Sequence, residues 1–253
     1  MSELIDCINN LSAKDIIKSV AKTANGTPFY LQTTGGGVSF LPTDLANLYL
    51  WLRSDLGITL NGTDVSLWED QSTTGYDFDQ IVAADQPSYQ LAQINGYPSV
   101  TFDGVSEFLE GVAGDLDLST WHIFMVINNF TYALGRNVGN KDYAGNSDPS
   151  QITTRDDAAV DAFSFANVTG WHLAEITCVE GATTNAWRDG LASVSNPLGA
   201  QTWEFDAMGN YRGGVAFSSG KAVEYIIYSD IKTGSDLTAI KNYIATRYAL
   251  TIV

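Results

Sequence analysis

The fold class is decided by the stretch INGYPSVTFDGVSEFLEG, residues 94 to 111. Apolar and polar residues alternate along its first half, so Val100 and Phe102 face one side of an extended strand and the hydroxyl residues between them face the other. Asp103 and Gly104 then predict a turn, because glycine accepts a positive φ and an aspartate carboxylate accepts hydrogen bonds from turn amides. The stretch therefore indicates a half-buried β-strand that ends in a hairpin.

Strand patterns continue along the rest of the chain. Long apolar runs predict three further strands, at residues 122–130, 171–180 and 221–230. Asp189-Gly190 between two short flanks predicts another hairpin turn. A closing helix is predicted over 236–248, with Ser235 as its N-cap and an apolar stripe of Leu237, Ile240 and Ile244. We therefore expect an all-β antiparallel sandwich with one C-terminal helix.

Residues 1–40 differ in pattern from the rest of the chain. Apolar residues recur there at helical spacing, and we interpret them as a partner-binding face made of Leu4, Ile5, Ile8, Ile16, Ile17 and Val20. Three consecutive glycines at positions 35 to 37 mark a boundary. The sequence thus predicts a helical arm with a glycine-rich linker over 1–40 and a single jelly-roll domain over 41–253.

The charge balance excludes two classes of partner. The 253 residues include 29 acidic and 13 basic side chains, a net charge of −16. Such a chain repels phosphate backbones and anionic lipids, and no cluster of Lys and Arg offers a local exception. The start of the chain lacks the basic and apolar regions of a signal peptide, and no apolar run reaches the roughly 20 residues of a membrane span. We expect no nucleic acid, no membrane and no export.

The ordered set of motifs resembles the LamG-like, concanavalin A-like lectin/glucanase jelly-roll superfamily over residues 41–253. The motifs that carry the resemblance, besides the opening stretch, are LYLWLRSDLGIT, VSLWEDQSTTGYDFDQ, WHIFMVINN, NAWRDG and VEYIIYSD with LTAIKNYIATRYAL. Trp51 and Trp68 are interpreted as anchors of the sandwich core, and Phe102, Asp103 and Gly104 as structural residues of the hairpin. The resemblance implies a two-sheet jelly roll that hydrolyses glycans, binds glycans or serves as a bare scaffold.

The catalytic signatures of these functions are missing from the sequence. The E-x-D-x-x-E pattern of the hydrolases with this fold is absent. The nearest glutamate pairs, Glu107 with Glu110 and Glu175 with Glu180, have the wrong parity or spacing to point together on a strand. His122 and His172 each follow a tryptophan and have no further His or Cys nearby for a zinc site, so we interpret them as residues that cap strands. We therefore expect no enzyme and no catalytic residues.

Oxygen-rich loops leave the question of calcium open. The candidate ligands are Asp77, Asp79, Asp115, Asp117 and Asp148. Calcium takes carboxylate and carbonyl oxygens without a sharp sequence signature. The alternatives are a bound Ca²⁺ and turns that are simply solvated, and no other cofactor is expected.

A sandwich of extracytoplasmic type without an export signal predicts a bacteriophage protein, made in the host cytoplasm and released by lysis. We expect a non-enzymatic virion structural protein, a capsid decoration or a head or tail fibre component. Its arm would anchor it to other virion proteins, and closed symmetry predicts a homo-oligomer, with a trimer as our expectation. The alternative is a glycan-binding lectin or adhesin that recognises host-surface carbohydrate, which exposed aromatic rings on a concave sheet face would favour.

Overall fold

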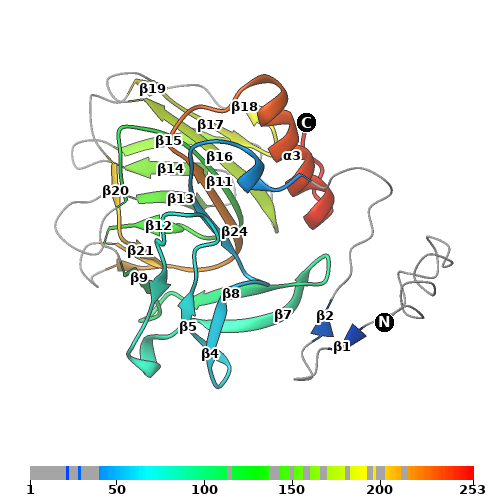
Figure 1. Cartoon of the computed structure of the whole chain (residues 1–253). Helices are drawn as coiled ribbons and strands as arrows, with labels where there is room; N and C mark the ends of the chain where they lie inside the picture. The colour runs from blue at the N-terminus through cyan, green and yellow to red at the C-terminus, as the bar shows by residue number, and fades with distance from the viewer. Residues whose placement is uncertain are drawn as a thin grey trace, which may run out of the picture. The chain divides into compact units, whose positions relative to one another are not determined.

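The structure is a computed structural model of the chain, shown in Figure 1. It describes residues 21–22, 28–29, 40–112, 116–136, 143–148, 151–155, 160–165, 170–179, 183–192, 196–197, 203–211 and 216–253. The chain divides into two compact units, Met1–Phe40 and Leu41–Val253. The described part of the first unit is an antiparallel strand pair, β1 (Ala21–Lys22) with β2 (Pro28–Phe29). In the described part of the chain, no helix has the length and apolar character needed to cross a membrane.

The larger unit is an antiparallel β-sandwich of two layers (Figure 1). The strands of the first layer lie in the order β18 (Leu191–Ala192), β17 (Thr183–Arg188), β16 (His172–Val179), β11 (Thr120–Asn128), β24 (Ser219–Tyr228) and β3 (Leu48–Arg53). The first half of β24 also pairs with β8 (Tyr97–Asp103), which forms a hairpin with β7 (Ser88–Ile94). This confirms the predicted fold class of an antiparallel sandwich.

The second layer covers the inner face of the first. Its strands are β15 (Val160–Ser164), β14 (Gln151–Arg155), β13 (Tyr143–Asp148), β12 (Leu134–Gly135), β21 (Ala207–Met208), β9 (Leu109–Gly111), β6 (Phe78–Asp79), β5 (Asp64–Trp68) and β4 (Ile58–Asn61). Short strands flank the layers, namely β10 (Leu116–Leu118) with β20 (Trp203–Phe205), β22 (Asn210–Tyr211) with β23 (Ala216–Phe217), and β19 (Asn196–Pro197) beside β17.

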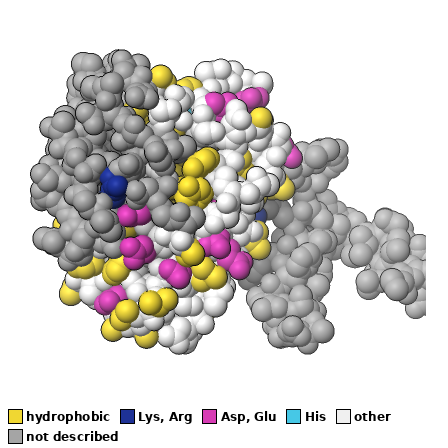
Figure 2. All heavy atoms as spheres, turned by 60° about the vertical axis from the view of Figure 1, so that its left-hand side comes forward, with side chains coloured by type: hydrophobic (Ala, Val, Ile, Leu, Met, Phe, Trp, Pro, Cys, Tyr) yellow, Lys and Arg dark blue, Asp and Glu magenta, His cyan; other side chains and the backbone are white. Residues whose placement is uncertain are grey.

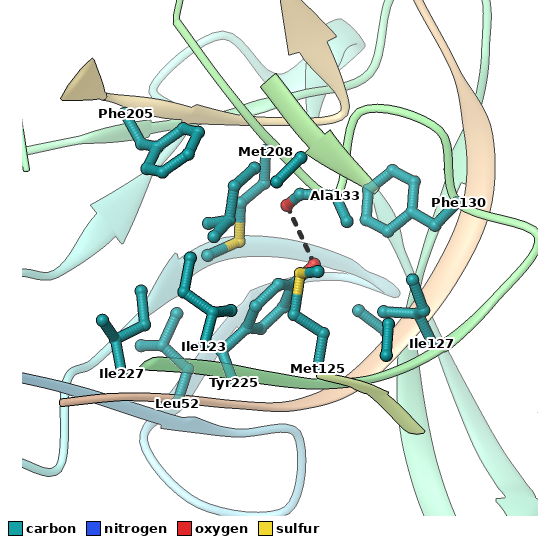
Figure 3. Close-up of a cluster of buried hydrophobic side chains, with 14 of the residues drawn as sticks. Leu52, Ile123, Met125, Ile127, Phe130, Ala133, Phe205, Met208, Tyr225 and Ile227 are labelled. Carbon is teal, nitrogen blue, oxygen red and sulfur yellow. Dashed lines mark hydrogen bonds between the residues drawn. The ribbon is translucent and has the colours of Figure 1, made fainter. Parts of the chain in front are cut away.

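The core lies between the two layers, and β11 and β24 supply its centre (Figure 3). Alternate residues of β11 point inward, among them Ile123 and Met125, which are fully buried. Burial of each such side chain stabilises the fold by roughly 1.5 to 3 kcal/mol. Tyr225 also points inward from β24, and its hydroxyl donates to the carbonyl of Ala133 at 3.0 Å, so the one polar atom of this ring is satisfied.

The local predictions agree with the structure in most places. The three long apolar runs form β11, β16 and β24, and Asp189 and Gly190 form a turn with φ values of 50° and 84°. The closing helix, α3, covers Gly234–Tyr248. Its N-cap is Thr233, so the predicted cap at Ser235 is wrong by two residues, and Ser235 lies in the first turn.

α3 packs on the outer face of the first layer through polar contacts as well as apolar ones (Figure 1). Trp51 points to this face, because its neighbours on β3 point into the core. Its indole nitrogen donates to Glu224 at 2.6 Å, and the Tyr243 hydroxyl of α3 donates to the same oxygen at 2.8 Å. Lys241 Nζ lies 2.9 Å from a carboxylate oxygen of the buried Glu175. Trp51 is therefore a buried anchor, as predicted, but it lies against the helix and outside the cluster between the two layers.

Candidate functional site

A groove opens at the end of the first layer where β8, β11 and β24 meet. It consists of two adjoining hollows that share Asn129 and Ser219 in their walls. The first, of about 310 Å³, is also lined by Asp103, Thr131, Tyr132, Phe217 and Ser218. The second, of about 220 Å³, is lined further by Thr101, Asn128 and Lys221. The lining residues of the two hollows thus carry carboxylate, amide, hydroxyl and ammonium groups, and they come from β8, β11, β24 and the segments beside them.

Aromatic packing supports the groove from beneath. Phe130 follows the groove residue Asn129 and stacks on Phe102 with ring centroids 4.7 Å apart. Gly220 lies against Phe130, and a Cβ at Gly220 would approach it to 2.6 Å, so glycine is needed there. In Figure 3, Phe130 and Ala133 lie at the edge of the core above Tyr225, whose hydroxyl bonds Ala133. The loop that forms one wall is therefore held by the core.

The turn after β8, residues 103–107, forms another wall and is fixed by two carboxylates. The predicted hairpin is wrong, because β8 pairs with β7 and β24 whereas β9 pairs with β6 and β21. Asp103 Oδ1 accepts hydrogen bonds from the backbone amides of Val105, Ser106 and Glu107 at 2.7, 3.2 and 3.3 Å. In return, Glu107 Oε2 accepts the backbone amide of Asp103 at 2.8 Å. The two residues therefore close the turn reciprocally.

The two carboxylates of this turn, Asp103 and Glu107, differ in pKa. Burial opposes ionisation of Asp103, but its hydrogen bonds from backbone amides outweigh burial and lower its pKa. Burial, together with the charge of Asp103, raises the pKa of Glu107 to about 7. Asp103 is therefore ionised at neutral pH, whereas Glu107 is only partly so. The sequence analysis considered Glu107 only with Glu110 along a strand, so it missed the contact of Glu107 with Asp103 across the turn.

Gly104 allows the turn to approach β24 closely. Its φ is 76°, in the left-handed region that favours glycine. A Cβ at this position would lie 2.6 Å from the backbone nitrogen of Ser219, which pairs with Asp103 in the ladder. The turn that the sequence singled out therefore also positions Ser219 in the groove.

Lys221 is the one charged residue among the described residues that line the second hollow. Its ammonium donates to the side-chain oxygens of Gln90 at 2.9 Å and Gln93 at 2.7 Å. Both partners are neutral amides. Among the residues that the structure describes, no carboxylate forms an ion pair with Lys221.

The two calcium candidates that the structure describes, Asp77 and Asp79, belong to no cluster of metal-binding side chains among the described residues. Asp77 Oδ1 accepts the backbone amide of Asp70 at 2.8 Å, and Asp79 pairs with Glu110 on the second layer, where burial and then the Glu110 charge raise the pKa of Asp79. The side chains of the other three candidates, Asp115, Asp117 and Asp148, lie outside the described residues. Within the described ranges, no three His, Cys, Asp or Glu side chains form a group that could hold a metal. Figure 2 shows acidic side chains gathered on one face among hydrophobic ones, without a basic cluster beside them.

Both histidines are buried structural residues. His122 Nε2 lies 3.0 Å from Glu175 Oε1, and its Nδ1 accepts the backbone amide of Lys232 at 3.2 Å. Burial lowers the pKa of His122 despite the carboxylate. His172 is fully buried at the start of β16, and burial and then the charge of Arg188 lower its pKa to about 4. Neither imidazole lines the groove.

Two other expectations concern the surface. No Trp, Tyr or Phe side chain described by the structure is exposed, so the exposed rings that would favour a glycan-binding lectin are missing from this part of the chain. The half-buried rings of Tyr132 and Phe217 line the first hollow instead. The proposed partner-binding residues, Leu4, Ile5, Ile8, Ile16, Ile17 and Val20, lie outside the described residues. Attachment through the arm therefore stays a prediction.

Comparison with known proteins finds similarity in structure only. No family profile and no curated protein matches the sequence. Trypanosoma rangeli sialidase in complex with sialic acid is similar with a TM-score of 0.53 and 12% identity, over 83% of this chain and 34% of that chain. Its covalent intermediate with 2,3-difluorosialic acid gives a TM-score of 0.54 and 13% identity, over 98% and 40%. An arabinofuranosidase complexed with arabinofuranosyl-α-1,2-xylobiose gives 0.53 and 11%, over 73% and 51%.

These similarities support the coarse part of the resemblance and correct one prediction. The chain shares its β-sandwich with carbohydrate-active proteins, while its place in the LamG-like group and its origin in a phage stay predictions. The prediction that the chain is not an enzyme is contradicted, because the solved structures that share the fold are glycosidases. The chain spans about a third to a half of their length, and at these identities the likeness shows the fold alone.

Proposed function

We propose that the larger unit binds carbohydrate and that the groove beside the Asp103 turn is the binding site. The observation that carries this proposal is the first hollow, where hydroxyl, amide and carboxylate groups stand beside the half-buried rings of Tyr132 and Phe217. Sugar hydroxyls donate and accept hydrogen bonds, which suits such a mixed set of groups. The C–H faces of a sugar ring pack on aromatic side chains.

The construction of the groove suits binding without rearrangement. Asp103 is fixed by the amides of its own turn, and the opposite loop is held by Phe130 on the core. Preorganised groups lose little conformational freedom when a ligand binds, so more of the interaction energy contributes to affinity. The hollows together fall in the range of roughly 300 to 1,000 Å³ that is typical of small-molecule sites.

The lack of exposed rings among the described residues narrows the mode of binding. A flat platform of rings would bind the face of a long polysaccharide. A hollow with half-buried rings binds a chain end or a short segment instead, because only one or two sugar units fit within its walls. We therefore propose recognition of a terminal or short glycan segment.

Hydrolysis at the same groove is the second candidate. Asp103 and Glu107 have pKa values pushed in opposite directions, as the acid and the base of a glycosidase do. Asp103 lines the first hollow, whereas Glu107 is not among the residues of its lining. Release of reducing sugar from bound oligosaccharides measures this activity, and its loss in Glu107→Gln without loss of binding would support it.

Glycan binding is tested with a matched pair of asparagine variants. Asn129 lies in both hollows with a φ of 49°, so Asn129→Gly keeps the backbone conformation and removes the amide. Asn47 also has a left-handed φ, of 60°, and bonds Asp230 away from the groove, so Asn47→Gly is the control. The full chain should bind members of a glycan array. Asn129→Gly should weaken their affinity about tenfold, the effect of one lost hydrogen bond, and Asn47→Gly should not. Absence of binding to every glycan, or equal effects of the two variants, would refute the proposal.

The virion role stays a prediction from the sequence. It rests on the apolar residues of the arm within 1–40, which lie outside the described part of that unit. Mass spectrometry of purified phage particles checks it directly. Detection of the chain in stoichiometric amounts would support attachment to capsid or tail, and its absence from particles would exclude it.

A further inference from the structure

We propose that the groove selects an acidic oligosaccharide, with an anionic sugar unit in the Lys221 hollow and an uncharged unit in the Asp103 hollow. The inference rests on the proposed glycan binding and adds the class of ligand and its direction in the groove. It starts from one anion in the lining of the first hollow and one cation in the lining of the second, which adjoins it.

Lys221 differs in its partners from Lys232 and Lys241, two other lysines of the domain that are at least partly buried. Lys232 pairs with Asp230 at 2.8 Å, and Lys241 pairs with Glu175 at 2.9 Å. Acidic residues outnumber basic ones by 29 to 13, so carboxylate partners are abundant in this chain. Lys221 nevertheless bonds only amide oxygens among the described residues. Its charge is held in place without being neutralised.

The arrangement leaves Lys221 ready to bind an anion. An ammonium has three N–H donors, and Gln90 and Gln93 accept two of them. The third remains for a ligand in the second hollow, which Lys221 lines. Hydrogen bonds to charged groups contribute about 1.5 to 3 kcal/mol, about twice as much as those between neutral groups. Thr101 and Asn128, which pair with Lys221 on either side in the ladder, add a hydroxyl and an amide for the rest of the sugar.

The other hollow fixes the direction of the ligand. The backbone hydrogen bonds that Asp103 accepts keep it ionised, so an anionic group there would be repelled. The two hollows share Asn129 and Ser219, which a ligand that fills both would contact at its middle. The ligand therefore has at least two units, and its acidic unit lies on the side of Lys221.

The test uses the full chain on an array of oligosaccharides that share neutral cores and differ only at one terminus. Each core is presented without a charge, with a terminal carboxylated sugar and with a terminal sulfated sugar. We expect at least one acidic series to bind about tenfold or more tightly than its neutral core. The carboxylated and sulfated members show which anion the hollow accepts.

Two variants connect the preference to Lys221. Lys221→Met should abolish the preference, so that acidic members bind no more tightly than their neutral cores, while Lys221→Arg, which keeps the charge, should retain it. Thermal unfolding of both variants establishes that they fold. Equal binding of neutral and acidic members, or a preference that survives in folded Lys221→Met, overturns this inference and leaves the proposed function standing. No binding to any member overturns both.

Discussion

Replacement of Gly104 by alanine should destabilise the larger unit more than the same replacement at Gly62. The two glycines share a left-handed backbone, with φ values of 76° and 69°. They differ in their surroundings. A Cβ at Gly104 would lie 2.6 Å from the backbone nitrogen of Ser219, whereas a Cβ at Gly62 would have no atom within 4 Å. The difference in stability between the two variants therefore measures the effect of the close approach of the Asp103 turn to β24.

The expected magnitudes follow from these two terms. A left-handed φ costs an alanine roughly 1 to 2 kcal/mol at either position. At Gly104 the contact with Ser219 adds about 1 to 3 kcal/mol, because a paired strand backbone yields less readily than a flexible side chain. We expect Gly62→Ala to lower the free energy of unfolding by about 1 to 2 kcal/mol, and Gly104→Ala by about 2 to 5 kcal/mol.

Urea unfolding, followed by far-UV circular dichroism, measures both losses. A shift of the midpoint at unchanged slope reports a change in stability alone. In a domain of this size, 1 kcal/mol corresponds to roughly 2 to 4 °C in melting temperature, so the two variants are separable by heating as well. Comparisons of this kind usually scatter by about 0.5 kcal/mol. Losses of stability that agree within that margin for the two variants would show that the Asp103 turn does not approach β24 as described.

Two further predictions concern pH. The folded pKa of Glu107, about 7, exceeds its ordinary 4.5, so its contribution to stability is complete below pH 4.5 and is lost as pH rises through 7. Glu107→Gln should flatten this decline in urea titrations, and an unchanged profile would contradict the assignment. The folded pKa of His172, about 4, lies below its ordinary 6.5, so its contribution is complete above pH 6.5 and is lost as pH falls through 4. His172→Leu should remove about 3 kcal/mol of the acid-side loss, and a steeper acid limb would refute the burial argument.

The strands and the helix could be predicted because their signals are local. Alternation along β8, the apolar runs of β11 and β24 and the Asp189-Gly190 turn each lie within a few residues. The burial of Trp51 could be predicted, but its place could not, because a large aromatic residue favours burial on either face of a sheet. The structure settles the face through parity: Leu50 and Leu52 point into the core, so Trp51 points to α3.

The groove could not be predicted from the sequence. Asp103, Asn129 and Ser219 are separated by up to 116 positions, and only the pairing of β8 and β11 with β24 brings them together. The partners of Lys221 are 131 and 128 positions away, so no spacing along the chain points to them. The search for a catalytic pair tested residues along one strand, which explains why the reciprocal bonds of Asp103 and Glu107 across a turn were missed.

The polar contacts beneath α3 restrict how the helix can dock. An apolar stripe such as Ile240 with Ile244 would tolerate sliding or rotation of the helix on the sheet. Directional contacts do not, because a displacement of one turn, about 5.4 Å, would part Lys241 from Glu175 and leave that buried carboxylate without its cation. Glu224 would lose the hydroxyl of α3 in the same movement. The helix therefore has a single register on the sandwich, and the charged groups act as the markers that define it.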